Sequence, residues 1–384
     1  MTSTCSGTLL VGATGHLGGL VASGLLADGH GTIVVPMRDP AKRPEMLAQI
    51  GEELDREGLS GEIDLSRLVA VPLPSPGRFH ELDETLVRFG VDEIVHCAGS
   101  VDYFDPIRLK EANIDLTADL LEVAKRLRLR RFIYLSTAFS SGYAEGRVLE
   151  RLHPSPKLDP TEYTRSKREA EFLVVASGVP HLIVRPSIVI GDSRDGRYTG
   201  KPYGLYQFWF SGERFLSDRY RDVMHIVAPS RALPLLHQDA FKQGFMAARR
   251  HFTENAIVHL CSRPDKLPTV RALFTLWFES VMCPQQLHHY DRIEDVPLDG
   301  LDHRLRTWLE FTAVNTEISC HSWNFESTNL DILRAAGLTF ADATLDTVRL
   351  CQDRFVAQSS RLTAYLRDSL PQPLRSADTV VESI

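Results

Sequence analysis

The residues with the clearest chemical meaning are a tyrosine and a lysine four positions apart, in Tyr163-Thr-Arg-Ser-Lys167. In a helix this spacing puts both side chains on one face. A nearby ammonium stabilises a phenolate and lowers the pKa of the tyrosine, which can then exchange a proton with a carbonyl oxygen near neutral pH. Thr137 follows a predicted strand, and its hydroxyl can hold that oxygen. The pattern favours carbonyl chemistry, although an exposed helical pair is the alternative for the tyrosine and lysine taken alone.

A glycine-rich turn lies near the start of the chain, in Gly12-Ala-Thr-Gly-His-Leu-Gly18. A predicted strand precedes it and a predicted helix follows it. Glycines at this spacing allow a tight turn, close approach of backbone N–H groups to a pyrophosphate, and close packing of the helix on the strand. The turn therefore predicts a dinucleotide-binding site.

The end of the second predicted strand bears on which dinucleotide is bound. Where an acidic residue would bind the ribose 2′-hydroxyl of NAD, the sequence has Arg38, with Lys42 or Arg43 behind it. An arginine there can pair with the 2′-phosphate of NADP. NADPH is therefore predicted in preference to NADH. The alternative is a solvated basic turn in which Asp39 binds the ribose.

The elements around these motifs follow a βαβ pattern. Short β-branched runs alternate with longer amphipathic stretches, which is typical of a parallel sheet. We predict six strands at 8–11, 32–35, 68–71, 93–96, 131–135 and 181–185, and helices between them at 16–27, 44–57, 82–89, 107–127 and 161–177. The fold class is therefore α/β, with a Rossmann-type, doubly wound parallel sheet.

The second half of the chain is less regular. After residue 185 come several glycines and prolines and an aromatic cluster, which favour a loop or lid on the substrate side. Residues 233–236, 239–250 and 256–260 resemble a return to the main sheet, and the remainder is mainly helical. We predict a dinucleotide-binding domain at 1–193 and about 233–264, a smaller helical substrate domain and lid at about 194–232 and 265–370, and a flexible tail at 371–384.

Composition limits the class of protein. The 384 residues carry a formal charge of −7, which gives no support for binding nucleic acid or anionic membranes through bulk electrostatics. No stretch reaches the roughly 18 apolar residues of a membrane span, and no cationic segment precedes the first apolar run. No spacing of the six cysteines and fourteen histidines predicts a metal site. A cytoplasmic protein with reduced cysteines is expected.

Taken together, these stretches resemble an extended short-chain dehydrogenase/reductase. The resemblance is closest to the thioester reductase and fatty acyl-CoA reductase branch, with its male-sterility-like NAD-binding domain. The matching stretches are Gly12 to Gly18, the run from Ile94 to Phe104 that includes Val101-Asp-Tyr-Phe104, Asn113, Phe132 to Ala138, Tyr163 to Glu171, and Arg185 to Asp192.

The resemblance implies a role for individual residues. Thr137, Tyr163 and Lys167 would be catalytic, and Asn113 would hold a water in the proton relay. The residues implied in cofactor binding are Gly12, Thr14, Gly15, His16, Leu17, Gly18, Arg38, Ala98, Gly99, Lys167, Pro186 and Ser187. The alternatives are a surface amide for Asn113, and a simple strand end for Pro186 and Ser187.

Two positions depart from the pattern of that branch. Its third strand usually leads into Gly-Asp-Leu, with the aspartate near the adenine, whereas this chain has Val71-Pro72-Leu73. His16 occupies a place often held by an aromatic or aliphatic residue. The adenine contact must therefore be absent or replaced, whereas the backbone of His16 can still contact phosphate.

The activity implied is NADPH-dependent reduction of an acyl thioester, bound to coenzyme A or to an acyl or peptidyl carrier protein, to an aldehyde and possibly on to an alcohol. Tyr203, Tyr206, Phe208, Trp209 and Phe210 could wall an acyl channel, and Arg194, Arg197 and Lys201 could meet a phosphopantetheine phosphate; ordinary packing is the alternative. A carbonyl reductase or hydroxy dehydrogenase, a nucleotide-sugar epimerase and a non-catalytic NADP sensor remain open. The protein would be a monomer or a homodimer.

Overall fold

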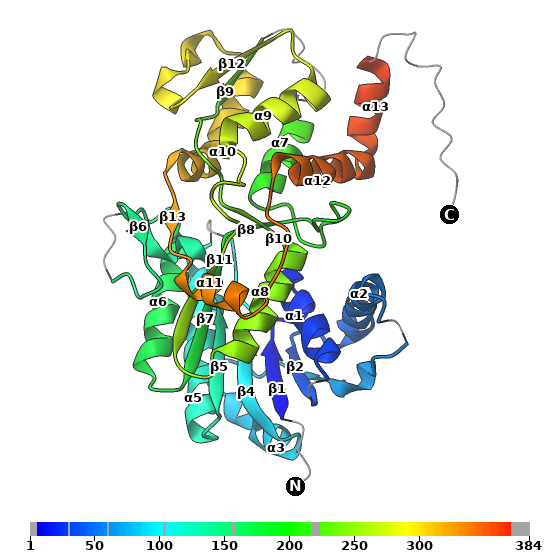
Figure 1. Cartoon of the computed structure of the whole chain (residues 1–384), viewed down its shortest axis with the longest axis vertical. Helices are drawn as coiled ribbons and strands as arrows, with labels where there is room; N and C mark the ends of the chain where they lie inside the picture. Colours follow the sequence, from blue (N-terminus) through cyan, green and yellow to red (C-terminus); the bar gives the residue numbers. More distant parts are fainter. Residues whose placement is uncertain are drawn as a thin grey trace.

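The computed structural model describes residues 6–29, 31–59, 61–102, 105–154, 158–216 and 223–369. Its lower half in Figure 1 is a parallel sheet of seven strands, in the order β11-β7-β5-β4-β1-β2-β3. Those strands are β1 (Gly7–Val11), β2 (Ile33–Met37), β3 (Leu68–Pro72), β4 (Val91–His96), β5 (Arg131–Leu135), β7 (His181–Pro186) and β11 (Ala256–Leu260).

The sheet is buried on both faces. Every residue of β1 is buried, and successive side chains of this strand point into two different cores. Leu10 belongs to the first core, and Leu9 and Val11 belong to the second. This double burial explains the continuous apolar runs of the strands. The first core is covered by α1 (His16–Ala27), α2 (Arg43–Arg56) and α8 (Gln238–His251), the second by α3 (Asp83–Arg88), α5 (Leu116–Arg126) and α6 (Glu162–Ala176). The predicted doubly wound sheet is confirmed.

The predicted helix at 107–127 is divided in the structure. It consists of α4 (Pro106–Leu109), a π-helical segment (Lys110–Asp115) and α5. A π-helical turn inside a helix widens the backbone and often lies at a functional site. Here it carries Asn113, which is fully buried.

The upper half of the molecule has its own apolar core. Its helices are α7 (Leu205–Leu216), α9 (Val270–Trp277), α10 (His303–Cys320), α12 (Leu345–Gln358) and α13 (Ser360–Ser369). A second π-helical segment (Phe278–Met282) continues α9. Stacked aromatic pairs hold this core together: Phe208 lies on Phe274 with ring centroids 3.9 Å apart, and Trp209 lies on Trp277 at 6.0 Å. The mainly helical second domain is therefore present, with α7 formed by the aromatic cluster that the sequence placed in a lid.

Three two-stranded parallel ladders lie outside the main sheet. They pair β8 (Ile188–Ile190) with β10 (Leu235–His237), β9 (Val223–Val227) with β12 (Gln286–Tyr290), and β6 (Arg147–Val148) with β13 (Asn324–Phe325). The sequence pattern predicts that residues 233–236 return to the main sheet. That expectation was wrong for β10, which pairs with β8, and correct for β11, which forms the seventh strand beside β7.

The predicted division into two domains also differs from the structure at one segment. Residues 265–370 were all expected in the substrate domain. However, α11 (Thr328–Ala335) packs against β11 and α8, and its Leu330 and Leu333 are buried in the core of the main sheet (Figure 1). The reason is that these two leucines complete an apolar surface left open beside the last strand. The predicted tail at 371–384 lies outside the described residues.

Candidate active site

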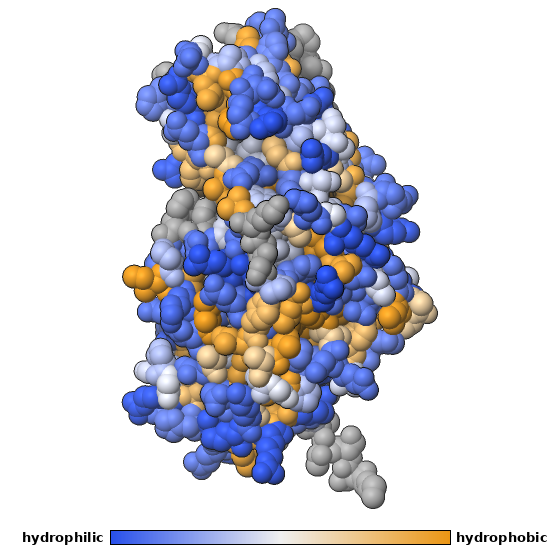
Figure 2. All heavy atoms as spheres, turned by 90° about the vertical axis from the view of Figure 1, so that its left-hand side faces the viewer, coloured by the Kyte–Doolittle hydropathy of each residue, from blue (hydrophilic) through white to orange (hydrophobic). Residues whose placement is uncertain are grey.

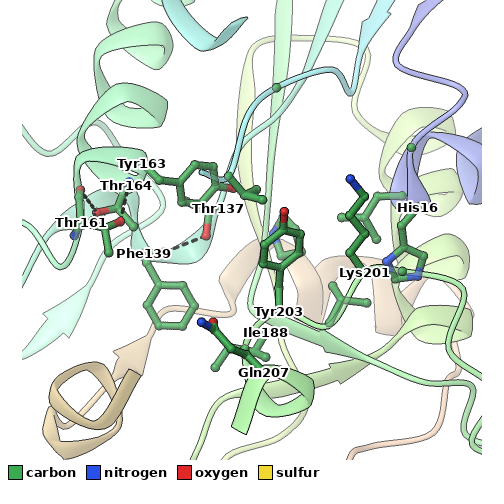
Figure 3. Close-up of a pocket in the computed structure, with 18 of the residues that line it drawn as sticks. His16, Thr137, Phe139, Thr161, Tyr163, Thr164, Ile188, Lys201, Tyr203 and Gln207 are labelled. Carbon is green, nitrogen blue, oxygen red and sulfur yellow. Dashed lines mark hydrogen bonds between the residues drawn. The ribbon is translucent and has the colours of Figure 1, made fainter. Parts of the chain in front are cut away.

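A cavity of about 870 Å³ opens at the carboxyl ends of the strands, between the sheet and the helical half of the molecule. Both halves line it, because the segments after β4, β5 and β7 face residues of α7 and α10 across it. The switch between β1 and β4 in the strand order lies at this edge, which is where ligands bind in open parallel sheets. Figure 3 shows Tyr163 and Thr137 on one side of the cavity and His16 and Lys201 on the other.

Most of the residues implied by the resemblance line this one cavity: Thr14, Gly15, His16, Leu17, Gly18, Arg38, Ala98, Gly99, Thr137, Tyr163, Lys167, Pro186 and Ser187. Two do not, Gly12 and Asn113. Gly12 shapes the turn from behind, and Asn113 lies one layer deeper. Of the stretch from Val101 to Phe104, Tyr103 and Phe104 lie outside the described residues.

The glycine turn is closely packed against the segment that follows β4. Gly12 has a φ of +100°, and a Cβ there would lie 2.5 Å from the backbone nitrogen of Ala98. A Cβ on Gly18 would lie 2.0 Å from the Gly12 carbonyl oxygen. These contacts exclude any side chain at either position. They also bring the backbone N–H groups at the N-terminus of α1 to the cavity wall, where a phosphate would be bound.

The catalytic candidates come from two neighbouring elements. Thr137 directly follows β5 and is 6% exposed, and its hydroxyl accepts a hydrogen bond from the backbone nitrogen of Phe139 at 3.4 Å. Tyr163 and Lys167 lie one turn apart on α6. A capping box at Thr161 and Thr164 satisfies the first backbone groups of this helix and so defines where it begins. Figure 3 shows Tyr163 and Thr137 next to each other.

Lys167 is held in an unusual environment for an ammonium. It is 4% exposed, and its Nζ lies 4.2 Å from the centre of the Tyr134 ring on β5. Burial lowers the pKa of Lys167 to about 7, against the opposing charges of Cys97 and Glu171. Within the described parts of the chain, no residue accepts a hydrogen bond from this Nζ in the structure. Lys167 can therefore donate to a ligand without first giving up a partner.

The protonation of Tyr163 differs from the sequence expectation. The expectation was that Lys167 lowers the pKa of the phenol. In the protein alone, burial instead raises the pKa of Tyr163 to about 12. The reason is that burial removes water from the phenolate, which penalises the charged form of the tyrosine. A protonated phenol is the form that can give a proton to a carbonyl oxygen.

Asn113 has a positioning role in the structure. Its Oδ1 accepts from the backbone nitrogen of Ser100 at 2.7 Å, and its Nδ2 donates to the Ser100 carbonyl oxygen and to Ser166 Oγ at 3.0 and 2.8 Å. Its backbone carbonyl accepts from the Thr117 hydroxyl. The residue thus joins the segment after β4 to α6. The surface-amide alternative is excluded by its burial, and the role in holding a water stays a prediction.

Arg38 and Asp39 have different roles in the structure. Arg38 is exposed and lines the cavity. The Asp39 carboxylate accepts from the backbone nitrogen of Ala41 at 3.1 Å and so caps the short helical turn that follows. The aspartate has a structural role, which leaves the arginine to face a ribose at this strand end.

His16 is a neutral, packed residue. Its Nε2 lies 3.0 Å from Gln238 Oε1, and its ring meets the edge of Tyr198 with centroids 4.7 Å apart. Burial lowers the pKa of His16 to about 4. The side chain therefore joins the glycine turn to the loop of residues 191–204, which passes over the cavity.

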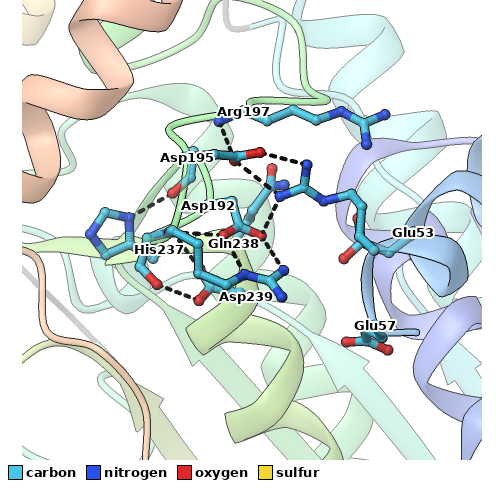
Figure 4. Close-up of polar contacts among 12 residues, drawn as sticks. Glu53, Glu57, Asp192, Asp195, Arg197, His237, Gln238 and Asp239 are labelled. Atoms are coloured by element: carbon cyan, nitrogen blue, oxygen red, sulfur yellow. Dashed lines mark hydrogen bonds and ion pairs between the residues drawn. The ribbon is translucent and has the colours of Figure 1, made fainter. Parts of the chain in front are cut away.

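Two of the three cations suggested for a phosphopantetheine phosphate are committed elsewhere. Arg194 is paired with Asp192 at 2.7 Å, and Arg197 forms an ion pair with Glu52 of α2. Figure 4 shows Asp192, Asp195 and Arg197 of this loop within a network of polar contacts, near Glu53 of α2 and Asp239 of α8. Lys201 lines the cavity. Only the lysine is placed to meet a ligand in the cavity.

The aromatic residues of the lid divide in the same way. Tyr206 and Trp209 are buried in the core of the helical half, so ordinary packing accounts for them. Tyr203 and Phe208 line the cavity. Phe210 is 39% exposed.

Several cavity residues were missed by the sequence analysis. Gln207 lies among the aromatic residues of α7, and Asn315 lies on α10, a helix that the sequence did not single out. Phe139 and Gln49 also line the wall. A polar residue inside an aromatic run was the one available signal, and it pointed to Gln207 alone.

Comparison with known proteins places the chain in a family. Residues 10–221, more than half of the chain, match the family of NAD-binding domains described as male sterility protein. The chain belongs to the male sterility protein family. The match covers the end of β1, the glycine turn, β2 to β8, and the cluster of Thr137, Tyr163 and Lys167.

Similar sequences carry related descriptions. A putative fatty acyl-CoA reductase of Drosophila melanogaster is 31% identical over 225 residues, covering 47% of this chain and 40% of that protein. Sterol demethylase protein B of Methylococcus capsulatus is 28% identical over 190 residues, covering 48% of this chain and 52% of that protein. The chain thus spans about half the length of these relatives.

Solved structures share the whole fold. The terminal R domain of the myxalamid biosynthetic pathway has a TM-score of 0.71 at 20% identity and covers 93% of this chain and 92% of that chain. The aureusimine cluster reductase domain has a TM-score of 0.65 at 17% identity, with the same coverage of both chains. UDP-glucose 4-epimerase of Thermus thermophilus, bound to NAD, has a TM-score of 0.59 at 15% identity and covers 92% of this chain and all of that chain. The likeness extends through the helical half of the molecule.

Among the described residues, no helix has the length and apolar character that crossing a membrane requires. In the same residues, no group of three or more histidine, cysteine or acidic side chains could hold a metal ion.

Proposed function

We propose that this protein reduces an acyl thioester, carried on coenzyme A or on an acyl or peptidyl carrier protein, to an aldehyde and a free thiol with NADPH. The observation that carries the proposal is the meeting of Thr137, Tyr163 and Lys167 with the glycine turn in one cavity. The family, and the description of the Drosophila relative as a putative fatty acyl-CoA reductase, support the thioester as substrate.

The residues present fit a dinucleotide with a 2′-phosphate. Side chains are excluded at Gly12 and Gly18, so the backbone at the start of α1 can approach a pyrophosphate. Arg38 faces the cavity from the end of β2, where the adenosine ribose of such a ligand would lie. Lys167 has a free ammonium for the other ribose. NADPH would supply the hydride that adds to the thioester carbon.

The protein's own groups then act on the carbonyl oxygen. The hydroxyls of Thr137 and Tyr163 would donate to this oxygen and stabilise the negative charge that develops on it. Tyr163 protonates the resulting alkoxide and takes the proton back as the C–S bond breaks. The thiolate leaves and takes a proton from water. One hydride and one proton are thus consumed, and an aldehyde, a thiol and the oxidised cofactor are formed.

The test follows nicotinamide absorbance together with release of free thiol. We expect NADPH oxidation with acyl-pantetheine or acyl-CoA thioesters, and loss of both signals in Tyr163→Phe. Analysis of the product as aldehyde or alcohol decides whether a second reduction follows. Thiol release without cofactor oxidation would mean hydrolysis and would refute the proposal.

The choice of NADPH over NADH depends on Arg38. A hydrogen bond to a charged group contributes about 1.5–3 kcal/mol, so Arg38→Ala should lower kcat/KM for NADPH by about 10- to 150-fold. The value for NADH should change little. Equal losses with both cofactors would show that Arg38 does not read the 2′-phosphate.

A second candidate is reduction of a free carbonyl compound by the same residues. The observation that favours it is the match to sterol demethylase protein B, whose description points to a sterol. Ketones and aldehydes offered beside the thioesters distinguish the two, because only a thioester releases a thiol. An epimerase would bind NAD and show no net oxidation of added NADPH.

We propose a cytoplasmic location. The five cysteines in the described part of the chain are free thiols, which is typical of proteins from reducing compartments.

A further inference from the structure

Two amide side chains meet at the wall of the cavity. Gln207 comes from α7 and Asn315 from α10, and both line the cavity. Asn315 Nδ2 donates to Gln207 Oε1 at 3.1 Å. Figure 3 shows the Gln207 side chain rising between Phe139 and Tyr203, on the side of the cavity that also holds Thr137.

This pairing leaves one amino group and one carbonyl oxygen without a protein partner in the described part of the chain. With Asn315 donating, the Gln207 amino group and the Asn315 carbonyl oxygen have no protein partner among the described residues. If both amides were turned over, the Asn315 amino group and the Gln207 carbonyl oxygen would be left instead. In either arrangement the pair presents one free amino group, which can donate, and one free carbonyl oxygen, which can accept. A secondary amide presents the complementary set, one oxygen and one N–H.

The surroundings of the pair are mainly apolar. Val314 and Ile318 lie on the same helix and line the cavity with Phe139. Two nearby hydroxyls on α10 already form hydrogen bonds within the helix. The Thr312 hydroxyl donates to the Trp308 carbonyl oxygen at 2.9 Å. In the same way, the Ser319 hydroxyl donates to the Thr316 carbonyl oxygen at 2.7 Å.

An aliphatic chain bound here would displace water from the two free amide groups and would provide no hydrogen-bond partner in its place. Leaving a buried donor or acceptor unpaired costs about 1–3 kcal/mol for each group. An amide of the substrate would pair with both groups at once. The site therefore discriminates in favour of a ligand that carries an amide at this position.

We propose that Gln207 and Asn315 form a subsite that binds a secondary amide of the thioester substrate; this inference rests on the proposed thioester reduction. The amide has two possible sources, the pantetheine arm or the acyl group itself, as in an N-acylaminoacyl or peptidyl thioester. Both present the same chemistry to the pair.

The experiment compares three thioesters. Octanoyl ethanethiol ester has no amide, octanoyl pantetheine has amides in the arm alone, and the ethanethiol ester of N-hexanoylglycine has an amide in the acyl group alone. Values of kcat/KM with NADPH are measured for the wild type and for Gln207→Glu. The glutamate keeps an acceptor for Asn315 but cannot donate to a substrate carbonyl. Thr316→Val is the matched control, because Thr316 lines the same cavity on α10.

We expect Gln207→Glu to lower kcat/KM about tenfold for an amide-bearing thioester and to leave the amide-free ester nearly unchanged, the size of one lost hydrogen bond. A loss confined to octanoyl pantetheine assigns the amide to the arm. A loss confined to the N-hexanoylglycyl ester assigns it to the acyl group. An equal change for all three esters, or the same selective loss in Thr316→Val, overturns the subsite.

A binding measurement separates this inference from the proposed function. Unreactive hexyl thioethers of pantetheine and of ethanethiol, and the thioether analogue of the N-hexanoylglycyl ester, are titrated into the wild type and Gln207→Glu by calorimetry. If no thioester is reduced, the proposed function fails. The amide subsite then stands only if an amide-bearing thioether binds about tenfold more tightly to the wild type than to the variant, and it falls if the two proteins bind it equally.

Discussion

At the scale of single residues, burial sets the protonation of the catalytic pair. It raises the pKa of Tyr163 to about 12 and lowers that of Lys167 to about 7. The phenol is thereby kept protonated, ready to give a proton, while the ammonium is held close to its titration point. Both effects arise from desolvation, which penalises the charged form of each group.

This desolvation penalty on Lys167 lowers the free energy of unfolding of the protein. Its pKa is lower in the folded protein than its ordinary value of 10.5. The unfolded chain thus binds more protons between about pH 7 and pH 10.5, so stability rises with pH across that window. Lys167→Met should abolish reduction and raise the free energy of unfolding by about 1 kcal/mol. Chemical denaturation should show a larger gain at pH 6 than at pH 9, and a pH-independent gain would contradict this account.

The Tyr134 ring stabilises the charged form of Lys167. Cys97, which follows β4, and Glu171 of α6 also raise the pKa of Lys167 and so favour its charged form. Cation–π contacts are worth about 0.5–2 kcal/mol. Tyr134→Leu should therefore lower kcat by about tenfold and move the alkaline limb of the pH profile to lower pH.

Tyr134→Phe is the matched control for this prediction, because it keeps the aromatic face. It should retain both the rate and the pH profile of the wild type. If the leucine and phenylalanine variants behave alike, the ring face has no influence on Lys167.

At the scale of elements, the loop of residues 191–204 is anchored to α2 by charge. Arg56 pairs with Asp195 at 2.7 Å and with the fully buried Asp192 at 3.1 Å (Figure 4). Burial alone would raise the pKa of Asp192, but bonds from Arg194 and the charge of Arg56 lower it to about 2. The loop carries Lys201 to the cavity, so the anchor positions part of the site.

Removing this anchor should weaken both the fold and the site. Arg56→Met leaves the buried Asp192 carboxylate with fewer partners, and we expect a loss of about 1–3 kcal/mol in the free energy of unfolding at pH 7. Because the carboxylate has a lowered pKa when folded, the loss should shrink as the pH falls from about 4 to about 2. Arg349→Met, on the exposed surface of α12, is the control and should change stability little.

At the scale of the whole molecule, one side of the sheet half presents apolar surface. Figure 2 shows apolar side chains gathered on the lower part of the face that carries α5 and α6 in Figure 1. Val175 of α6 is 36% exposed, and Ile107 of α4 is 72% exposed. Contiguous apolar surface of this kind commonly marks a protein interface.

We expect this face to join two copies of the chain in a homodimer. Sedimentation equilibrium should give twice the chain mass for the wild type and the monomer mass for Val175→Asp. Ile332→Asp is a matched control, because Ile332 is also exposed, at 41%, and lies on α11, which packs on the opposite face of the sheet. If the wild type sediments with the monomer mass, the prediction of a homodimer is wrong.

The sequence by itself determined the dinucleotide-binding half and its chemistry. The turn from Gly12 to Gly18 and the pairing of Tyr163 with Lys167 involve residues that are close together in the sequence, so local patterns predict them. Runs of β-branched residues predict strands in the same way. The predicted strands therefore match β1 to β5, β7 and β11 closely, and the predicted cofactor residues came together at one sheet edge.

Only the tertiary structure decided what depends on residues far apart in the chain. Asn315 reaches Gln207 across 108 positions, and α11 returns to complete the core of the sheet. The ring of Tyr134 under Lys167 and the burial that reverses the expected pKa shift of Tyr163 also come from packing between elements. Local sequence patterns carry no record of such contacts, because desolvation and side-chain pairing are set by whichever element folds against a residue.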